Sequence, residues 1–81
     1  MSGPDLEVDA RGLLCPLPIL RLARAFRRAP GGTVARLLAT DPAAVEDVKT
    51  FCQEGSHELL SIERDGTTFA FRVRKLTATA L

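Results

Sequence analysis

The chain lacks most of the residues on which metal, redox and nucleotide chemistry depend. Its 81 residues include two cysteines, one histidine, and no tryptophan or tyrosine. Two cysteines and one histidine fall short of the four ligands of a structural zinc site, so we expect no metal. There is no Cys-x-x-Cys pair, no glycine-rich phosphate loop and no nucleotide fingerprint. Dithiol exchange and nucleotide-dependent chemistry are therefore not predicted, and we expect no cofactor.

Strong charge of one sign and long apolar runs are also missing. The formal net charge is +1, whereas proteins that bind nucleic acid or membrane surfaces usually carry a basic excess. Because no tyrosine or tryptophan is available to stack on bases, we do not expect direct nucleic-acid binding. Residues 13–20 are apolar but contain two prolines, and a membrane span needs about 20 apolar residues. The first five residues do not resemble a secretion signal, so we predict a cytoplasmic protein with reduced thiols.

The composition that remains is that of a small globular protein. Apolar residues make up 46% of the chain and charged residues 26%, which argues against disorder. A chain of this length has room for one domain. We expect a single domain over residues 1–81, with an ordered core at about 5–75 and short flexible ends that include a tail at 77–81.

Hydrophobic periodicity predicts six elements in the order strand-helix-strand-helix-strand-strand. Alternation at 6–10, 33–39, 57–64 and 67–74 indicates strands, and the helical period at 16–29 indicates the first helix. The second helix is predicted to start with Asp41 as its cap and Pro42 as its first residue. Gly55 is expected to stop it. The fold class is a two-layer α/β sandwich, β-α-β-α-β-β, with a four-stranded mixed sheet and two helices on one face.

The two cysteines occupy different settings. Cys52 lies in the apolar stripe of the second helix, so we interpret it as a core residue whose burial raises its thiol pKa. Its alternative role is that of a resolving thiol for Cys15. Cys15 directly precedes Pro16, which favours the first helical position. This spacing predicts Cys15 at the helix N-cap, where unpaired N–H groups and the helix dipole would favour the thiolate and lower its pKa.

Neighbouring residues strengthen the functional interpretation of Cys15. Gly12 turns the chain before it, Pro16 and Pro18 make the turn rigid, and Arg11 is a candidate for further support of the thiolate. The only histidine, His57, is predicted at the start of a distant strand, so a cysteine hydrolase lacks its base. A lone activated thiolate suits a group carrier, and sulfane sulfur is a suitable cargo because a persulfide is readily attacked by thiols.

The motif Cys15-Pro16-Leu17-Pro18, preceded by Asp-Ala-Arg-Gly-Leu at 9–13, resembles the TusA/SirA family of sulfur carriers. The similarity continues through Asp41-Pro42 to residue 75. It implies the sandwich fold and a persulfide on Cys15, loaded by a cysteine desulfurase or rhodanese and passed to an acceptor protein. Family destinations are tRNA thiolation, molybdenum-cofactor assembly and sulfur oxidation, and the sequence does not choose among them. Whether such a carrier counts as an enzyme is left open.

Two other functions remain as alternatives, a non-catalytic regulatory or RNA-binding module and a redox sensor that pairs Cys15 with Cys52. For the carrier we expect a monomer that meets its sulfur donors and acceptors transiently, through a small polar surface around Cys15. Arg21 and Arg24 are the docking candidates, because they belong to an arginine-rich side of the first helix and lie nearest to Cys15. The remaining arginines of that side are Arg27 and Arg28.

Overall fold

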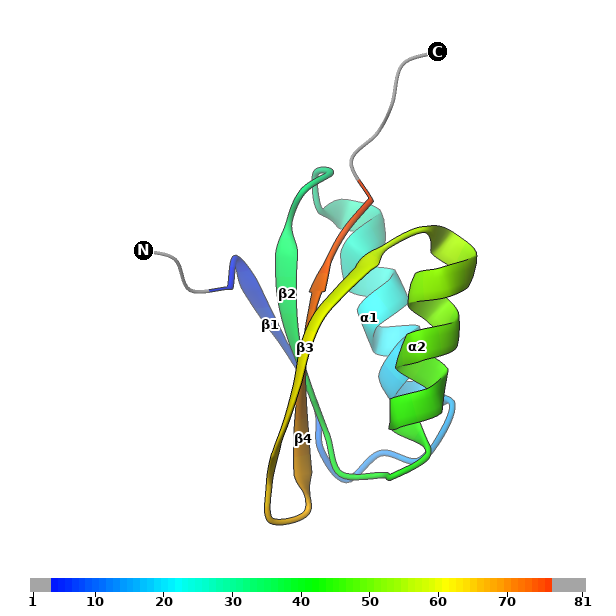
Figure 1. Ribbon diagram of the computed structural model, residues 1–81, viewed down its shortest axis with the longest axis vertical. Coiled ribbons are helices and arrows are strands. Elements are labelled where there is room, and N and C mark those ends of the chain that lie inside the picture. Colours follow the sequence, from blue (N-terminus) through cyan, green and yellow to red (C-terminus); the bar gives the residue numbers. More distant parts are fainter. Residues whose placement is uncertain (1–3, 77–81) are drawn as a thin grey trace.

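Four strands and two helices form the computed structural model of the protein, which describes residues 4–76. The elements are β1 (Leu6–Ala10), α1 (Leu17–Arg28), β2 (Val34–Ala39), α2 (Ala44–Gly55), β3 (Glu58–Asp65) and β4 (Thr68–Arg74). Their order confirms the prediction (Figure 1). The predicted tail at 77–81 lies outside the described residues. Neither of the helices found between residues 4 and 76 has the length and apolarity needed to cross a bilayer.

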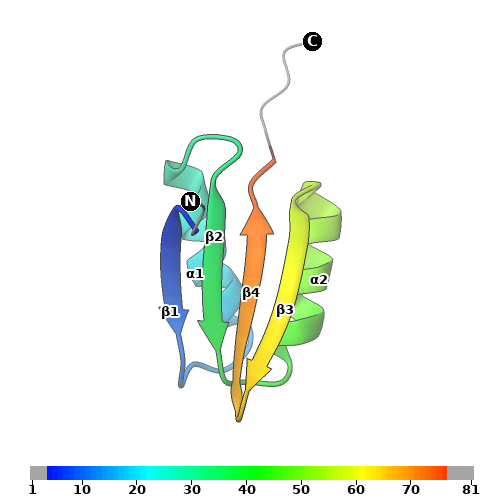
Figure 2. The same cartoon turned by 60° about the vertical axis from the view of Figure 1, so that its left-hand side comes forward.

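The four strands form one mixed sheet in the order β1-β2-β4-β3 (Figure 2). β1 and β2 are parallel, as predicted for two strands joined through a helix. β4 pairs antiparallel with both β2 and β3, and β3 contains a bulge between Leu59 and Ser61. β1 and β3 are therefore the two edges of the sheet.

Both helices cover the same face of the sheet, which leaves the other face open (Figure 1). The alternation of each strand directs its apolar side chains toward the helices. In β2 these are Ala35, Leu37 and Ala39, all fully buried. The core is completed from the other elements by Ala10, Leu22, Phe26, Ala44, Val48, Cys52, Phe71 and Val73.

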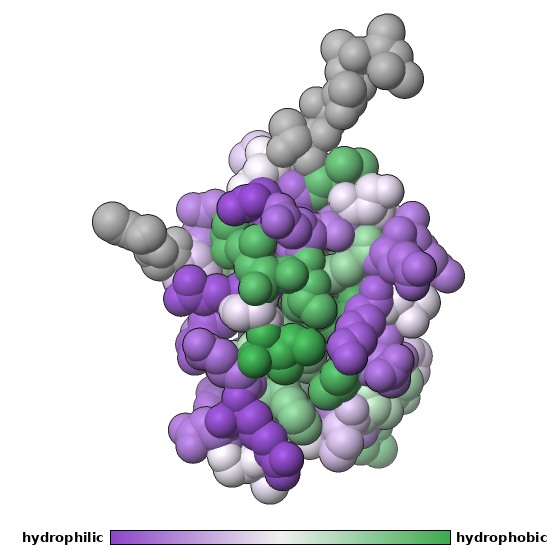
Figure 3. All heavy atoms as spheres, in the orientation of Figure 1, coloured by the Kyte–Doolittle hydropathy of each residue, from purple (hydrophilic) through white to green (hydrophobic). Residues whose placement is uncertain are grey.

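The surface along β3 and the helix layer remains partly apolar. Figure 3 shows apolar side chains gathered along the middle of this face between polar margins. On β3, Leu60 and Ile62 are exposed large hydrophobic residues. By contrast, the open sheet face carries charged residues, four of which form two ion pairs, Glu7 with Arg36 and Glu58 with Arg74.

The helix starts differ from the predicted ones. α1 begins at Leu17, with Pro16 as its N-cap, so Cys15 lies one residue before the cap instead of occupying it. α2 begins at Ala44, two residues later than predicted. The reason is that Asp41 forms a turn first: its Oδ1 accepts a hydrogen bond from the Ala43 N–H at 3.0 Å, and its main-chain carbonyl accepts one from Ala44.

His57 packs at the end of the helix layer that is farthest from Cys15. The His57 ring stacks on Phe51 with 4.9 Å between ring centroids, and its Nδ1 accepts a hydrogen bond from the Leu76 N–H. Gly55 ends α2, but the left-handed position after it belongs to Ser56. A Cβ on residue 55 would lie 2.7 Å from the His57 ring. Glycine is therefore needed here for close packing, and the predicted stop has a steric reason.

Candidate functional site

Cys15 lies where two loops meet beyond the carboxyl ends of β1 and β2. One loop connects β1 to α1 and the other connects β2 to α2. Two hydrogen bonds join them: the Gly12 N–H donates to Thr40 Oγ1 at 2.9 Å, and the Cys15 N–H donates to Asp41 Oδ2 at 2.7 Å. Because β1 and β2 are parallel neighbours, their carboxyl ends lie at the same edge, where α/β proteins commonly place their sites.

Gly12 is required by the path of the first loop. Its φ is +82°, in the left-handed region that glycine adopts without strain. The turn directs its N–H to Thr40, and the Leu13 N–H bonds back to the carbonyl of Ala10 at 3.2 Å. The positive φ of Gly12 therefore lets its N–H link this loop to Thr40 of the neighbouring loop.

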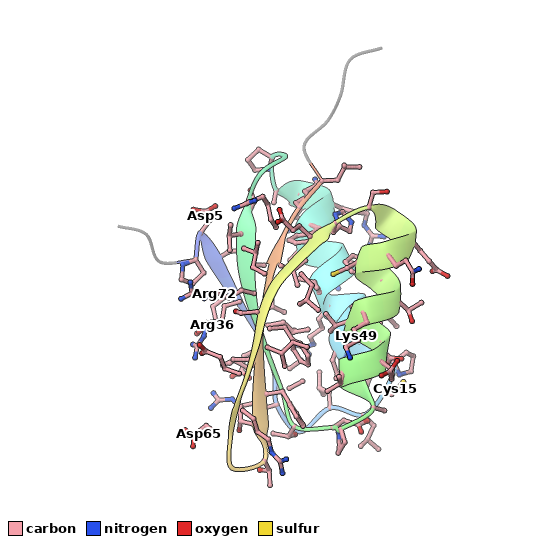
Figure 4. The ribbon with its side chains drawn as sticks, in the orientation of Figure 1. Asp5, Cys15, Arg36, Lys49, Asp65 and Arg72 are labelled. Atoms are coloured by element: carbon pink, nitrogen blue, oxygen red, sulfur yellow. The ribbon has the colours of Figure 1, made fainter. Side chains whose placement is uncertain are left out.

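The Cys15 thiol is exposed and faces the first turn of α2. Its Sγ lies 2.6 Å from Asp47 Oδ2, to which the thiol donates its hydrogen. Figure 4 shows Cys15 beside the start of α2. Asp41 holds the backbone of Cys15 while Asp47 holds its side chain. The sulfur itself is thus hydrogen-bonded to one carboxylate, and the Cys15 side chain remains exposed to solvent.

The predicted lowering of the Cys15 pKa is wrong. The hydrogen bond to Asp47 raises the pKa of the Cys15 thiol, and desolvation and the negative charges of Asp47 and Asp41 raise it further. Accepting main-chain N–H groups from Cys15 and Ala43 lowers the pKa of Asp41, which favours its charged form. At rest, Cys15 is a protonated thiol beside two carboxylates.

The two prolines explain why the helix end does not favour the thiolate. Pro16 and Pro18 have no N–H, and the Leu17 N–H is already bonded to the carbonyl of Leu14. Three of the backbone positions that usually make a helix N-terminus attractive to anions are therefore unavailable. The motif that marks the helix start also removes the donors on which the predicted pKa depended.

Within residues 4–76, none of the predicted arginines forms a hydrogen bond with the Cys15 sulfur or shifts its pKa. Arg11 forms a two-pronged ion pair with Asp9, with Nε–Oδ1 at 2.9 Å and Nη2–Oδ2 at 2.8 Å. This pair lowers the pKa of Asp9 to about 2. Arg11 is not among the groups that shift the Cys15 pKa, so its expected support for a thiolate is not present. Arg21 and Arg24 are exposed and line a hollow between α1 and β1.

The surface around Cys15 is partly apolar, whereas the sequence analysis expected a polar contact surface. Three leucines beside it are unusually exposed: Leu14 at 71%, Leu17 at 47% and Leu20 at 55%. These positions precede Cys15 or lie on the first turn of α1. Large side chains left in water beside a reactive group are typical of contact surfaces. We call these three residues the leucine collar.

Cys52 is a core residue, as predicted. It is only 5% exposed, belongs to the main hydrophobic cluster, and burial raises its thiol pKa. It lies five residues beyond Asp47, about 7.5 Å farther along α2. His57 is packed between Phe26 and Phe51 at the other end of the helices, so it cannot serve Cys15 as a base. Residues 4–76 contain no group of three metal-ligating side chains.

Asp47 and the leucine collar are the site residues that the sequence analysis missed. Asp47 lies 32 positions from Cys15 along the chain, so no local pattern connects the two residues. The signal that could have found it is topological. Parallel β1 and β2 bring the starts of α1 and α2 to one edge, so a carboxylate in the first turn of α2 faces the residue that precedes α1.

Comparisons with known proteins identify the family of the chain. The family model described as Sulfurtransferase TusA matches residues 6–75. The chain belongs to the TusA family. The sulfur carrier protein TusA of Allochromatium vinosum is 39% identical over 75 residues, which cover 93% of this chain and 99% of that protein. The protein of the same name from Pseudomonas putida strain GB-1 is 39% identical over 72 residues, 89% of this chain and 90% of that protein.

A solved structure confirms the fold of this TusA-family member. The crystal structure of a SirA-like protein from Desulfitobacterium hafniense superposes with a TM-score of 0.75, covering 85% of this chain and 95% of that chain. Sequence identity is 18%, so this likeness supports the architecture alone. The predicted resemblance to the TusA/SirA family and the predicted α/β sandwich are both confirmed.

Proposed function

We propose that this chain is a sulfur carrier that holds transferable sulfur as a persulfide on Cys15. The observation that carries the proposal is the contrast between the two thiols. Cys15 is exposed on a loop held by Asp41 and Asp47, whereas Cys52 is enclosed in the core. Relatives that are 39% identical over nearly their whole length bear the name sulfur carrier protein. The carrier reading therefore has support from both the site and the family.

Loading is a thiol-persulfide exchange. The Cys15 sulfur attacks the outer sulfur of a donor persulfide, R–S–SH, and a new S–S bond forms as the donor's own S–S bond breaks. The electron pair of the broken bond leaves with the donor sulfur, which becomes a thiol by taking up the proton lost from Cys15. The products are R–SH and a Cys15 persulfide, so no outside oxidant is required. An acceptor thiol removes the outer sulfur by the same exchange.

Asp47 makes the resting thiol selective about its donor. The carboxylate keeps Cys15 protonated, and a thiol is a poorer nucleophile than its thiolate. A donor that places a positive group against Asp47 would compete for the carboxylate and release the thiol for attack. The leucine collar supplies apolar contact area beside the sulfur. We infer that protein donors which contact both features load Cys15 faster than small sulfur compounds do.

The partners follow from this chemistry. The donor is a protein that carries a persulfide, such as a cysteine desulfurase or a rhodanese. The acceptor presents a thiol and belongs to tRNA thiolation, cofactor assembly or sulfur oxidation. Arg21 and Arg24 are proposed to draw acidic partner surfaces toward α1, which would mainly affect the rate of encounter. A single cytoplasmic domain that acts as a monomer is part of the same proposal.

The test is intact-mass measurement after incubation with a cysteine desulfurase and cysteine. We expect the native chain and Cys52→Ala to gain one sulfur atom, and Cys15→Ser to gain none. The serine variant should fold normally, because the main-chain bond to Asp41 persists and a serine hydroxyl can also donate to Asp47. Sulfur retained by folded Cys15→Ser would move the carrier site elsewhere. Loss of two hydrogens without sulfur gain would favour the redox sensor.

A further inference from the structure

We propose that the free edge of β1, together with the arginines of α1, binds an extended acidic segment of a partner protein as an added strand. The site is the groove between β1 and α1. Its floor contains Leu6, Val8 and Ala25, and its outer wall contains Arg21, Arg24 and Arg28. A second hollow shares Leu6, Ala25 and Arg28 and continues the groove past the end of α1.

The backbone of β1 is available for pairing on its outer side. β1 is an edge strand with β2 as its single neighbour, as the left margin of the sheet in Figure 2 shows. The Asp5 N–H bonds to Val34 of the β2 side, so alternation points the N–H and C=O of Leu6 and Val8 outward. The outward carbonyl of Ala10 already accepts from Leu13. The open stretch is therefore centred on Leu6 and Val8.

The two edges of the sheet differ in how they are protected. β3 carries a bulge between Leu59 and Ser61, a common device that disrupts pairing along an edge. β1 keeps an unbroken register with β2 over all five of its residues. A regular edge strand with unpaired backbone groups is the feature that partner strands use in β-augmentation.

Charge identifies the occupant as acidic. The arginines on the groove wall form no ion pair within residues 4–76, although other arginines of the chain do. The acidic side chains of β1 cannot neutralise them fully, since Glu7 pairs with Arg36 and Asp9 with Arg11. Arg21 has only a minor effect on the pKa of Asp9, the smallest of the charge effects on that group. Three unpaired guanidinium groups are thus left facing the groove.

The spacing of the arginines suits an extended chain. Positions 21, 24 and 28 follow the i, i+3, i+7 pattern of one helix face and span about 10 Å along α1. Alternate residues of a strand are about 6.7 Å apart. Two or three acidic side chains at alternate positions of an added strand therefore match this row. β1 leads toward the loop of Cys15, so a partner held here has its neighbouring surface near the sulfur.

The experiment uses fluorescence anisotropy with the full chain and a labelled octapeptide of alternating glutamate and valine. This binding does not require sulfur on Cys15, so its failure would leave the carrier proposal intact. We expect the pair Arg21→Glu and Arg24→Glu to weaken binding by about tenfold or more. The matched control is Arg27→Glu, because Arg27 lies on the same helix but lines a different hollow beside Phe51. It should bind nearly as well as the native chain.

A second measurement separates strand addition from charge attraction alone. A peptide N-methylated at alternate residues keeps its charge but cannot pair with an edge, and we expect it to bind at least about tenfold more weakly. The amides of Leu6 and Val8 should show the largest NMR shifts with the unmodified peptide. The proposal would be overturned if both peptides bound equally well. It would also be overturned if Arg27→Glu lost as much peptide affinity as the Arg21→Glu and Arg24→Glu pair. Tighter, arginine-dependent binding of a single-stranded RNA decamer would overturn it too, because that result would assign the groove to nucleic acid.

Discussion

Replacing Cys52 by alanine tests whether Cys52 serves only in core packing while Cys15 carries the sulfur. The side chain is 5% exposed in the main cluster, so losing the sulfur removes buried apolar volume similar to one methylene, about 0.8 kcal/mol. A remaining cavity on the order of 25 Å³ adds roughly 0.6 kcal/mol. The higher helix propensity of alanine in α2 offsets about 0.5 kcal/mol of this loss in the free energy of unfolding. We expect a net loss of about 1 kcal/mol, or roughly 4–8 °C in Tm.

The assay combines urea unfolding with sulfur loading on the same protein samples. Cys15→Ala is the matched control, because the exposed thiol contributes little packing and its removal should change stability by less than about 0.5 kcal/mol. The two variants should therefore show opposite patterns. Cys52→Ala loses stability and keeps loading, whereas Cys15→Ala keeps stability and loses loading.

One outcome would refute this reasoning directly. Cys52→Ala could unfold at the same urea midpoint as the native chain and yet lose sulfur transfer. Cys52 would then have a chemical role that its burial does not predict. The two thiols would then have to meet during the reaction, which requires α2 or the Cys15 loop to move. A disulfide between residues 15 and 52, detected by peptide mapping after mild oxidation, would support that outcome.

Three further predictions concern the groups around the site and at the far end of the helices. Asp47→Asn removes the main cause of the raised Cys15 pKa, so alkylation by iodoacetamide, measured in a Cys52→Ala background, should reach half its maximum at a lower pH. An unchanged midpoint would exclude Asp47 as the cause. Desolvation and Lys75 lower the pKa of His57 below 6.5, so the unfolded chain binds this proton more readily. The contribution of His57 to the free energy of unfolding is complete above about pH 6.5 and is lost as the pH falls through the folded-state pKa of His57. Urea unfolding at several pH values should show this pH dependence, and the His57→Gln variant should lack it. Lys75→Met removes an ammonium that donates to the two carbonyls near the end of α1, which should cost about 1–2 kcal/mol in urea unfolding; a loss near zero would mean that water replaces the ammonium.

Much of the fold follows from local patterns in the sequence. Alternation at residues 6–10 and the helical period after Pro16 predict the elements, and apolar residues on one side of each strand predict a single helix layer. The helix ends were harder, because Asp41 binds the main chain of Cys15, outside its own helix, and because Pro16 is the N-cap of α1 instead of its first residue. A capping residue predicts that a helix starts nearby, and tertiary contacts decide which residue begins it.

The sequence by itself determined the family, the order of the elements and the identity of Cys15 as the exposed candidate thiol. All of these depend on residues close together in the chain, such as the Cys-Pro-Leu-Pro motif and its preceding glycine. The state of that thiol was decided by tertiary structure. Asp47 comes from the next helix, 32 residues away, and it reaches the sulfur because parallel pairing of β1 and β2 brings the two loops to one edge. Electrostatic effects on a pKa act through space over a few ångströms, so no local pattern in the sequence could show that Cys15 rests as a protonated thiol.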